Sequence, residues 1–373
     1  MIHTLELIQE IQPEQIHGIM TGFEFPQCKI NKFFKRQGQI FGCFHKLSRQ
    51  HPGLGIKQIS LFRQEDTIAA GCSYYCLMRV EPQMVLQRER TVDLFMATEE
   101  NVQALSDNFH TIMNMFIDDD GFPNIVDLAA WDCRRIDYTV NLKFSDDAKA
   151  RLFLELTKKT SRYSRTTKKV QPGIASKEQS TAEGNGSIKN LLYDKKKQIQ
   201  ETYGGVPDDE LQQLIDNADG TIRFELQCKK RKIIGLKNRY GFASRSIINF
   251  LNEDIANDLL QKQYRQTVGS GDFYSFYHAQ KRINEAPFGQ KKKDNLVNFL
   301  RLVAQARHVD AALEQFVAGG TKIKRMDIVV EGSRNTFCNR LLDIAFVNIN
   351  PVLIPKERKV TFLQNPIDQL EIR

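Results

Sequence analysis

Two alternating segments each carry a carboxylate among polar residues, and they are the first sign of chemistry in the sequence. In residues 135–144 (RIDYTVNLKF), polar and apolar side chains alternate, and Asp137 lies on the polar side. Residues 221–228 (TIRFELQC) place Glu225 in the same way. Alternation with a period of two predicts strands. Two carboxylates on polar strand faces offer the hard oxygen ligands that Mg²⁺ or Mn²⁺ prefers, and such an ion would neutralise charge on a phosphate.

A third strand-like segment, residues 187–195 (SIKNLLYDK), ends in Tyr193 and Lys195. A tyrosine can attack a phosphate and form a covalent ester once its phenol, with an ordinary pKa near 10, loses its proton. Plainer interpretations stay open, because Tyr193 could be a packed aromatic. Each carboxylate also has an arginine two residues earlier in its strand (Arg135 and Arg223), so both could form ion pairs on a solvated sheet face.

Other catalytic classes lack their motifs. The sequence contains no G-x-x-x-x-G-K-[ST], G-x-G-x-x-G or G-x-S-x-G, which argues against nucleotide hydrolysis, dinucleotide binding and hydrolase-elbow chemistry. The seven histidines form no HxH or HExxH pair, so each is expected to be an ordinary surface or core residue. Seven scattered cysteines without a CxxC pair exclude a disulfide framework and structural zinc, and Cys72 and Cys76 are expected to be core thiols.

Composition indicates a soluble chain of 373 residues that binds a polyanion. It is 41% hydrophobic and 26% charged, with no uninterrupted apolar span and no leader, which predicts a cytoplasmic protein without a membrane partner. The net charge is +8, and residues 151–200 alone hold 12 Lys and Arg against 4 Asp and Glu, again +8. Concentrated basic charge is typical of a nucleic-acid partner, although a solvated lysine-rich loop is the plainer alternative.

The patterns predict an α+β protein. Strands are expected at residues 1–8, as a hairpin at 56–62 and 67–80, and at the three segments above; helices are expected at 101–116, 146–158 and 208–217. Residues 158–187, rich in Ser, Thr, Gly and Lys, predict a mobile basic loop. Helical periodicity at 244–264, 295–316 and 334–347 predicts a mostly helical domain over 246–373, after a first domain over 1–245.

Three short blocks, in this order and spacing, resemble the rolling-circle replication initiators of filamentous bacteriophages, the gene II proteins, and their plasmid relatives. The blocks are Arg135-Ile136-Asp137, Leu192-Tyr193-Asp194-Lys195 and Ile222-Arg223-Phe224-Glu225. The opening MIHTLEL and the segment 79–95 are also similar to that family, so the resemblance covers roughly residues 1–245. It implies a five-stranded antiparallel sheet with helices behind it, akin to nucleases with a His-hydrophobe-His metal site, although this chain lacks that histidine pair.

The resemblance also implies roles for individual residues. Tyr193 would be the nucleophile that nicks one DNA strand and stays joined to its 5′ phosphate, with Lys195 steadying the phenolate or the phosphate. Asp137 and Glu225 would hold the metal on the scissile phosphate. The remaining DNA-binding candidates are basic residues of the polar strand faces and of the predicted loop. They are Arg135, Arg223, Arg162, Arg165, Lys168 and Lys169.

The sequence therefore predicts a rolling-circle replication initiator that nicks and rejoins single-stranded DNA at a duplex origin. With no ATPase motif, it would depend on a host helicase and polymerase. A relaxase of plasmid or transposon transfer, and a non-catalytic basic DNA-binding protein, are the alternatives. In the helical domain, Lys291-Lys292-Lys293 and the helix that opens at Ser333-Arg334-Asn335 could read duplex DNA, or these helices could brace the nuclease sheet.

Overall fold

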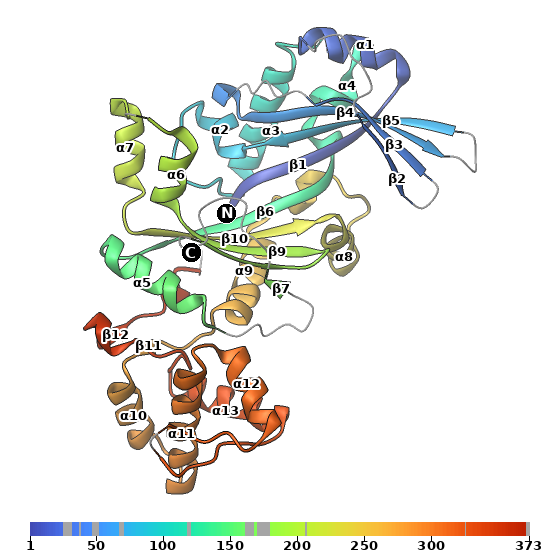
Figure 1. Ribbon diagram of the computed structural model, residues 1–373. Coiled ribbons are helices and arrows are strands. Elements are labelled where there is room, and N and C mark those ends of the chain that lie inside the picture. Colours follow the sequence, from blue (N-terminus) through green and yellow to red (C-terminus); the bar gives the residue numbers. More distant parts are fainter. Residues whose placement is uncertain are drawn as a thin grey trace. The chain divides into compact units, whose positions relative to one another are not determined.

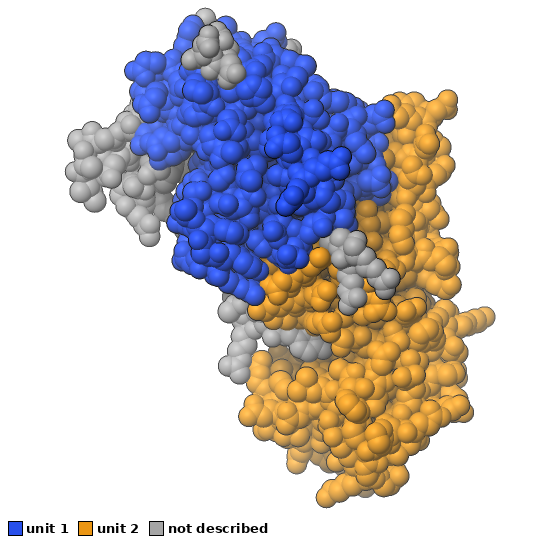
Figure 2. All heavy atoms as spheres, turned by 180° about the vertical axis from the view of Figure 1, so that it is seen from behind, with its two compact units in different colours: residues 1–139, 186–189, 225–256 blue, residues 140–185, 190–224, 257–373 orange. Residues whose placement is uncertain are grey.

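The computed structural model describes residues 1–24, 32–36, 39–46, 52–66, 71–117, 121–160, 168–169, 180–205, 207–324 and 326–370. The chain divides into two compact units (Figure 2). Unit 1 comprises residues 1–139, 186–189 and 225–256, and unit 2 comprises residues 140–185, 190–224 and 257–373. The units do not coincide with the predicted ranges 1–245 and 246–373, because three strands pass from one unit to the other.

The described strands form a ten-stranded sheet and a separate two-stranded one (Figure 1). The large sheet has the order β2 (Lys32–Arg36), β3 (Gln39–Lys46), β4 (Ile56–Asp66), β5 (Gly71–Val80), β1 (Ile2–Ile11), β6 (Asp132–Lys143), β10 (Thr221–Lys229), β9 (Ile188–Asp194), β8 (Ser180–Gly184) and β7 (Lys168–Lys169). The pairs from β2 through to β6, and the pair β7 and β8, are antiparallel. The five-stranded sheet implied by the resemblance is therefore wrong in its number of strands.

Unit 1 contains the helices α1 (Pro13–Gly22), α2 (Pro82–Gln87), α3 (Glu99–Met113), α4 (Pro123–Val126) and α8 (Lys230–Tyr240). Thr98 caps helix α3 by accepting a hydrogen bond from the Asn101 amide. The helix therefore begins at Glu99, two residues before the predicted start. Its apolar face is buried, and Phe109 contacts Trp131 edge to face at 6.3 Å. Trp131 is the single tryptophan of the chain and is fully buried, so it reports on the core of this unit.

Strand β10 departs from the half-buried strand that its alternation predicts. Its polar residues Arg223, Glu225 and Gln227 are each at most 6% exposed, and its apolar residues are buried as well. In β6, likewise, Asp137 and Thr139 are buried together with Tyr138, whose hydroxyl donates to the Phe250 carbonyl oxygen at 2.9 Å. The polar faces of both strands are thus removed from water where they carry the carboxylates.

Unit 2 contains α5 (Asp147–Thr157), α6 (Lys195–Tyr203), α7 (Asp209–Asn217), most of α9 (Glu253–Thr267), α10 (Phe276–Glu285), α11 (Gln290–Ala306), α12 (Val309–Ala318) and α13 (Arg334–Phe346), with β11 (Phe273–Tyr274) and β12 (Phe362–Leu363) as the small sheet. Asp146, Asp208 and Ser333 cap α5, α7 and α13 through their side chains, which confirms those predicted starts. Helix α9 packs on the sheet through Tyr264, whose ring meets Phe224 edge to face at 5.5 Å.

Three predicted elements differ from the structure. The helix expected at 244–264 is a short 3₁₀ turn, Ile247–Phe250, followed by α9. The helix expected at 295–316 breaks at Arg307, which has a positive φ of 61°, and restarts after the side-chain cap His308. The loop expected over 158–187 includes β7 and β8, which extend the sheet. No helix among the described residues combines the length and apolar composition that crossing a bilayer needs.

Candidate active site

The Asp137 and Glu225 carboxylates both lie in unit 1, on the central strands β6 and β10, and each residue is 1% exposed. Strand β1 runs antiparallel to β6 with Thr4 opposite Asp137. The register of this pair shifts between Ile2 and Thr4, which places an irregularity at His3. Such bulges re-aim a side chain out of the regular alternation.

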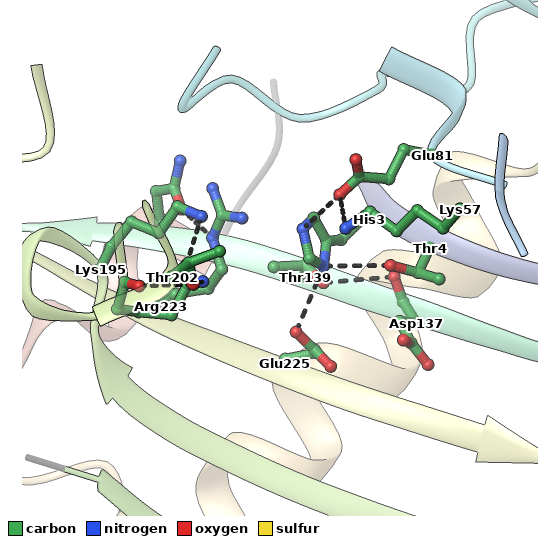
Figure 3. A network of polar contacts seen from close by, with 12 residues as sticks. His3, Thr4, Lys57, Glu81, Asp137, Thr139, Lys195, Thr202, Arg223 and Glu225 are labelled. Carbon is green, nitrogen blue, oxygen red and sulfur yellow. Dashed lines mark hydrogen bonds and ion pairs between the residues drawn. The ribbon is translucent and has the colours of Figure 1, made fainter. Parts of the chain in front are cut away.

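His3 lies between two carboxylates (Figure 3). Its Nδ1 is 3.4 Å from Glu225 Oε2, and its Nε2 is 3.4 Å from Glu81 Oε1. Lys57 forms a second ion pair with Glu81. Both ring nitrogens of His3 thus face a carboxylate oxygen.

Asp137 has a different cationic partner. Arg135, two residues earlier on β6, donates from Nε to Asp137 Oδ1 at 2.6 Å and makes a second, parallel bond to Oδ2. Two such bonds form the bidentate geometry in which an arginine holds a carboxylate most strongly. The ion pair considered as the plainer interpretation of this strand therefore exists, but it is buried rather than solvated.

The pKa values of the two carboxylates are shifted in opposite directions. Burial, followed by the charge of Glu225, raises the pKa of Asp137 to about 7 against the opposing effect of Arg135. Burial would also raise the pKa of Glu225, but the hydrogen bond and charge of His3, then Gln227 and Arg135, lower it to about 2. Gln227 Nε2 donates to Glu225 Oε1 at 2.7 Å. Two buried carboxylates that influence each other in this way share one electrostatic site.

Lys189 extends this site along β9. Burial, then the charge of Lys229, lowers the pKa of the Lys189 ammonium, while Glu225 and Asp137 raise it. The part of β9 that belongs to unit 1 thus brings a further cation near the two carboxylates.

The donor types suit a divalent cation, but the present contacts do not form a complete metal site. Asp137, Glu225 and His3 offer two carboxylates and an imidazole, and burial together with the charge of Glu225 raises the pKa of Asp137. In the described part of the chain, however, no three His, Cys, Asp or Glu side chains are grouped to hold a metal ion. Arg135 already occupies both carboxylate oxygens of Asp137 in this structure, so a bound cation would have to displace its guanidinium.

Tyr193 and Lys195 lie in unit 2, at the end of β9 and the start of α6. Tyr193 is 1% exposed and packs with Ala182 and Leu191 in a buried cluster. Because side chains alternate along a strand, it shares a face of β9 with Lys189. Lys195 is also buried, and its Nζ donates to Gln198 Oε1 at 2.8 Å.

Arg223, a further DNA-binding candidate, is 1% exposed, and its Nε donates to Asn141 Oδ1 at 2.8 Å within unit 2 (Figure 3). Its guanidinium is therefore not presented at the surface. Arg162 and Arg165 lie outside the described residues. Lys168 and Lys169 are described only as the backbone of β7.

The structure thus brings together Asp137, Glu225 and Arg135, and it adds His3 and Glu81, which the sequence analysis missed. His3 carries no motif of its own, because it is a single histidine near one end of a strand and it reaches Glu225 only through the strand order β1, β6, β10. The one available signal is its place in the opening segment that resembles the family.

The chain was compared with known proteins. Residues 93–250 match the family model that describes the N-terminal part of the phage gene II replication-associated protein. Neither the curated proteins nor the solved structures gave a match. The matched range contains all three blocks on which the resemblance rests and both buried carboxylates. Over residues 93–250, the chain is therefore similar to the gene II-like replication-associated proteins, the replication initiators of filamentous phages.

Proposed function

We propose that this protein nicks and rejoins one strand of origin DNA through a covalent bond to Tyr193. The match of residues 93–250 to this family supports a role in the initiation of rolling-circle replication. The observation that carries the finer proposal is the buried pair of Asp137 and Glu225, which lies inside the matched range together with the Tyr193 block. A buried acidic pair of this kind is an expensive arrangement unless it serves a site.

The proposed reaction exchanges one phosphodiester for another. The Tyr193 phenol loses its proton and its oxygen attacks phosphorus, the bond from phosphorus to the 3′ oxygen breaks, and that oxygen takes up a proton. The products are a 5′-phosphotyrosine on the protein and a 3′-hydroxyl that a polymerase can extend. Reversal of the same step by another 3′-hydroxyl restores a phosphodiester, so no nucleotide is consumed.

Asp137 and Glu225 are the residues that would hold Mg²⁺ or Mn²⁺. When bound, such an ion neutralises charge on the scissile phosphate. Lys195 would orient the phosphate or the phenolate from the position two residues beyond the nucleophile. Because Tyr193 packs with Ala182 and Leu191, the proposal requires that DNA binding opens this cluster to the scissile phosphate.

The proposed partners are single-stranded and duplex origin DNA, a host helicase and a host polymerase, and the proposed location is the cytoplasm. A non-catalytic DNA-binding protein is the alternative that the burial of Tyr193 favours. A relaxase differs in the origin that it serves rather than in its chemistry.

Nicking assays with three single variants test the proposal. Tyr193→Phe, Asp137→Asn and Glu225→Gln should each abolish nicking of single-stranded DNA from the protein's own replicon, while Tyr193→Phe still binds that DNA. Tyr277→Phe is the matched control, because Tyr277 is 70% exposed on α10 and should be dispensable. Nicking by Tyr193→Phe, or full activity of wild-type protein in the presence of a chelator, would refute the nucleophile or the metal respectively.

A further inference from the structure

The segment that follows Glu225 has an unbalanced charge that the proposed chemistry does not use. Between Glu225 and Glu253 the sequence contains seven basic residues and no acidic one. They are Lys229, Lys230, Arg231, Lys232, Lys237, Arg239 and Arg245. Most of them lie on helix α8, and all belong to unit 1 with the buried carboxylates.

Helix α8 is attached by one side and presents its basic side to water. Ile233 and Leu236 are buried and fix the helix to unit 1. Lys230, Arg231 and Arg239 are exposed. Because residues three and four apart share a face of a helix, these charges follow the outer side over its whole length.

Most of the cations on α8 have no acidic partner in the part of the chain that the structure describes. Among the described residues, no ion pair is formed by Lys230, Arg231, Lys232 or Lys237. Cations elsewhere do find partners, as in the pair of Lys292 with Asp343 at 2.7 Å. A row of like charges without acidic neighbours repels itself, and a polyanion relieves that repulsion.

The charges at the N-terminal end of α8 destabilise the helix. The cap residue Lys229 makes no side-chain cap, and the first turn holds basic residues but no acidic one. Cations at the positive end of a helix dipole cost roughly 0.3–1 kcal/mol each. By contrast, α5 and α7 begin with an Asp cap and acidic first turns. A local rule broken in this way indicates selection for something other than folding.

An exposed glycine lies in the middle of the basic face. Gly235 has no heavy atom within 4 Å of where a Cβ would lie, so no packing requires the glycine. A glycine inside a helix destabilises it by about 0.5–1 kcal/mol relative to alanine. The absence of a side chain at Gly235 allows a binding partner to approach the helix backbone closely.

The C-terminal end of α8 carries an aromatic platform. Tyr240 is 36% exposed and stacks on Phe242, with ring centroids 5.8 Å apart and planes within 20°. The Arg239 guanidinium lies 5.3 Å from the Tyr240 centroid. Phe242 meets the buried Phe250 edge to face at 5.6 Å, which fixes the platform to the core. A partly exposed ring supported in this way can stack on an unpaired base.

We propose that α8 and the turn after it form a binding surface for single-stranded DNA, with phosphates along the basic face and a base stacked on Tyr240. Stacking needs an unpaired base, which selects a single strand over a duplex. The surface begins directly after β10, the strand that carries Glu225. It therefore leads toward the two carboxylates. The inference deepens the proposed function by naming where its substrate lies, and it depends on that function only for the kind of DNA.

Binding of labelled oligo(dT) to the full chain tests this surface, with Tyr193→Phe as the background so that no nicking occurs. The triple variant of Lys230, Arg231 and Lys237, each changed to Gln, should flatten the slope of log affinity against log salt by about 2, since each lost phosphate contact on a single strand changes it by about 0.7. A control variant removes three exposed lysines of unit 2, Lys281, Lys322 and Lys356, by the same change. It should leave the slope unaltered.

The aromatic platform has its own test. Tyr240→Leu should weaken oligo(dT) binding by about 5- to 150-fold, the range expected for loss of one stacked base, while Tyr240→Phe should bind as the parent does. Equal slopes for the two triple variants would overturn the surface. Equal binding by Tyr240→Leu and Tyr240→Phe, or an equal loss of duplex binding in the triple variant, would overturn the assignment to a single strand.

Failure of the proposed function gives a different result. Wild-type protein that forms no covalent adduct, while the α8 variants change binding as described, would retain the surface and reject the nuclease. An adduct on wild-type protein with unchanged salt slopes in the α8 variants would retain the nuclease and reject the surface.

Discussion

Changing Asp137 to Asn should remove one specific component of the pH dependence of stability. In the folded protein, burial and the nearby charge of Glu225 raise the pKa of Asp137 to about 7, whereas an ordinary aspartate has 3.8. Between these values the folded state holds a proton that the unfolded state has lost. Stability from this group is therefore present at low pH and is lost as the pH rises toward 7.

The expected magnitude follows from the two pKa values of Asp137. In the middle of the window its contribution to the free energy of unfolding falls by about 1.4 kcal/mol per pH unit. Summed from pH 5 to pH 8, the loss is on the order of 2.5 kcal/mol. Asn cannot titrate, so the variant lacks this component.

Urea unfolding followed by tryptophan fluorescence measures this component directly, because Trp131 is the only tryptophan and lies in the core of unit 1 with Asp137. The difference in unfolding free energy between wild type and Asp137→Asn is taken at a series of pH values. Groups that do not interact with Asp137 titrate in the same way in both proteins and cancel. Asp107→Asn, a change on the exposed side of α3, is the control and should give a flat difference.

The expected difference curve declines from pH 5 to pH 8 and then levels. A difference that stays constant over this range would refute the account of two buried carboxylates that influence each other. A difference that rises with pH would also refute it, because it would mean that the Asp137 pKa is lowered rather than raised.

Two further changes in unit 1 have defined outcomes. His3→Gln removes the largest of the contributions that lower the pKa of Glu225 to about 2, so it should cost part of the roughly 3 kcal/mol that this shift represents above pH 4.5, and less as the pH falls toward 2. A cost that is the same at pH 3 and pH 7 would contradict this role. Gly235→Ala places a methyl group in open space on α8 and should raise the unfolding free energy by about 0.5–1 kcal/mol, measured by Trp131 fluorescence; a loss of stability would contradict the open environment of this glycine.

The central strands could be predicted as strands because their polar and apolar residues alternate with a period of two. Strand β6 alternates apolar residues that pack in the core with polar ones, and Asp146 directly after it signals the start of α5. Local chemistry also places α7 and α13, whose caps Asp208 and Ser333 use the short polar side chains that the pattern predicts.

Features that depend on neighbouring elements could not be predicted in this way. The burial of Arg223 and Glu225 depends on what covers the polar face of β10, and nothing within the strand encodes it. The break at Arg307 interrupts a sequence whose apolar periodicity continues through it, so the pattern alone predicts one helix. His3 became a site residue only when β1 was found beside β6.

The contacts of the C-terminal lysines also could not be predicted from the sequence. Lys292 pairs with Asp343, and Lys293 donates to the Asn284 carbonyl oxygen, so two of the three residues expected to hold a DNA backbone are engaged within the helical region. This region also packs back within unit 2, as the bond between Tyr264 and Asn365 shows. Point variants of the full chain are therefore the suitable test of duplex recognition.

The central claim is that Tyr193 becomes joined to DNA. Full-length protein is incubated with divalent metal and single-stranded DNA of its own replicon labelled at the 3′ end, which is the end that stays on the protein after attack on a 5′ phosphate. The mixture is denatured and digested with trypsin, which releases residues 190–195 (NLLYDK) with Tyr193 as the only tyrosine. The account predicts labelled protein with the nucleotide on this peptide, and no label with Tyr193→Phe. Label on another tyrosine, or no labelled protein at all, would contradict it.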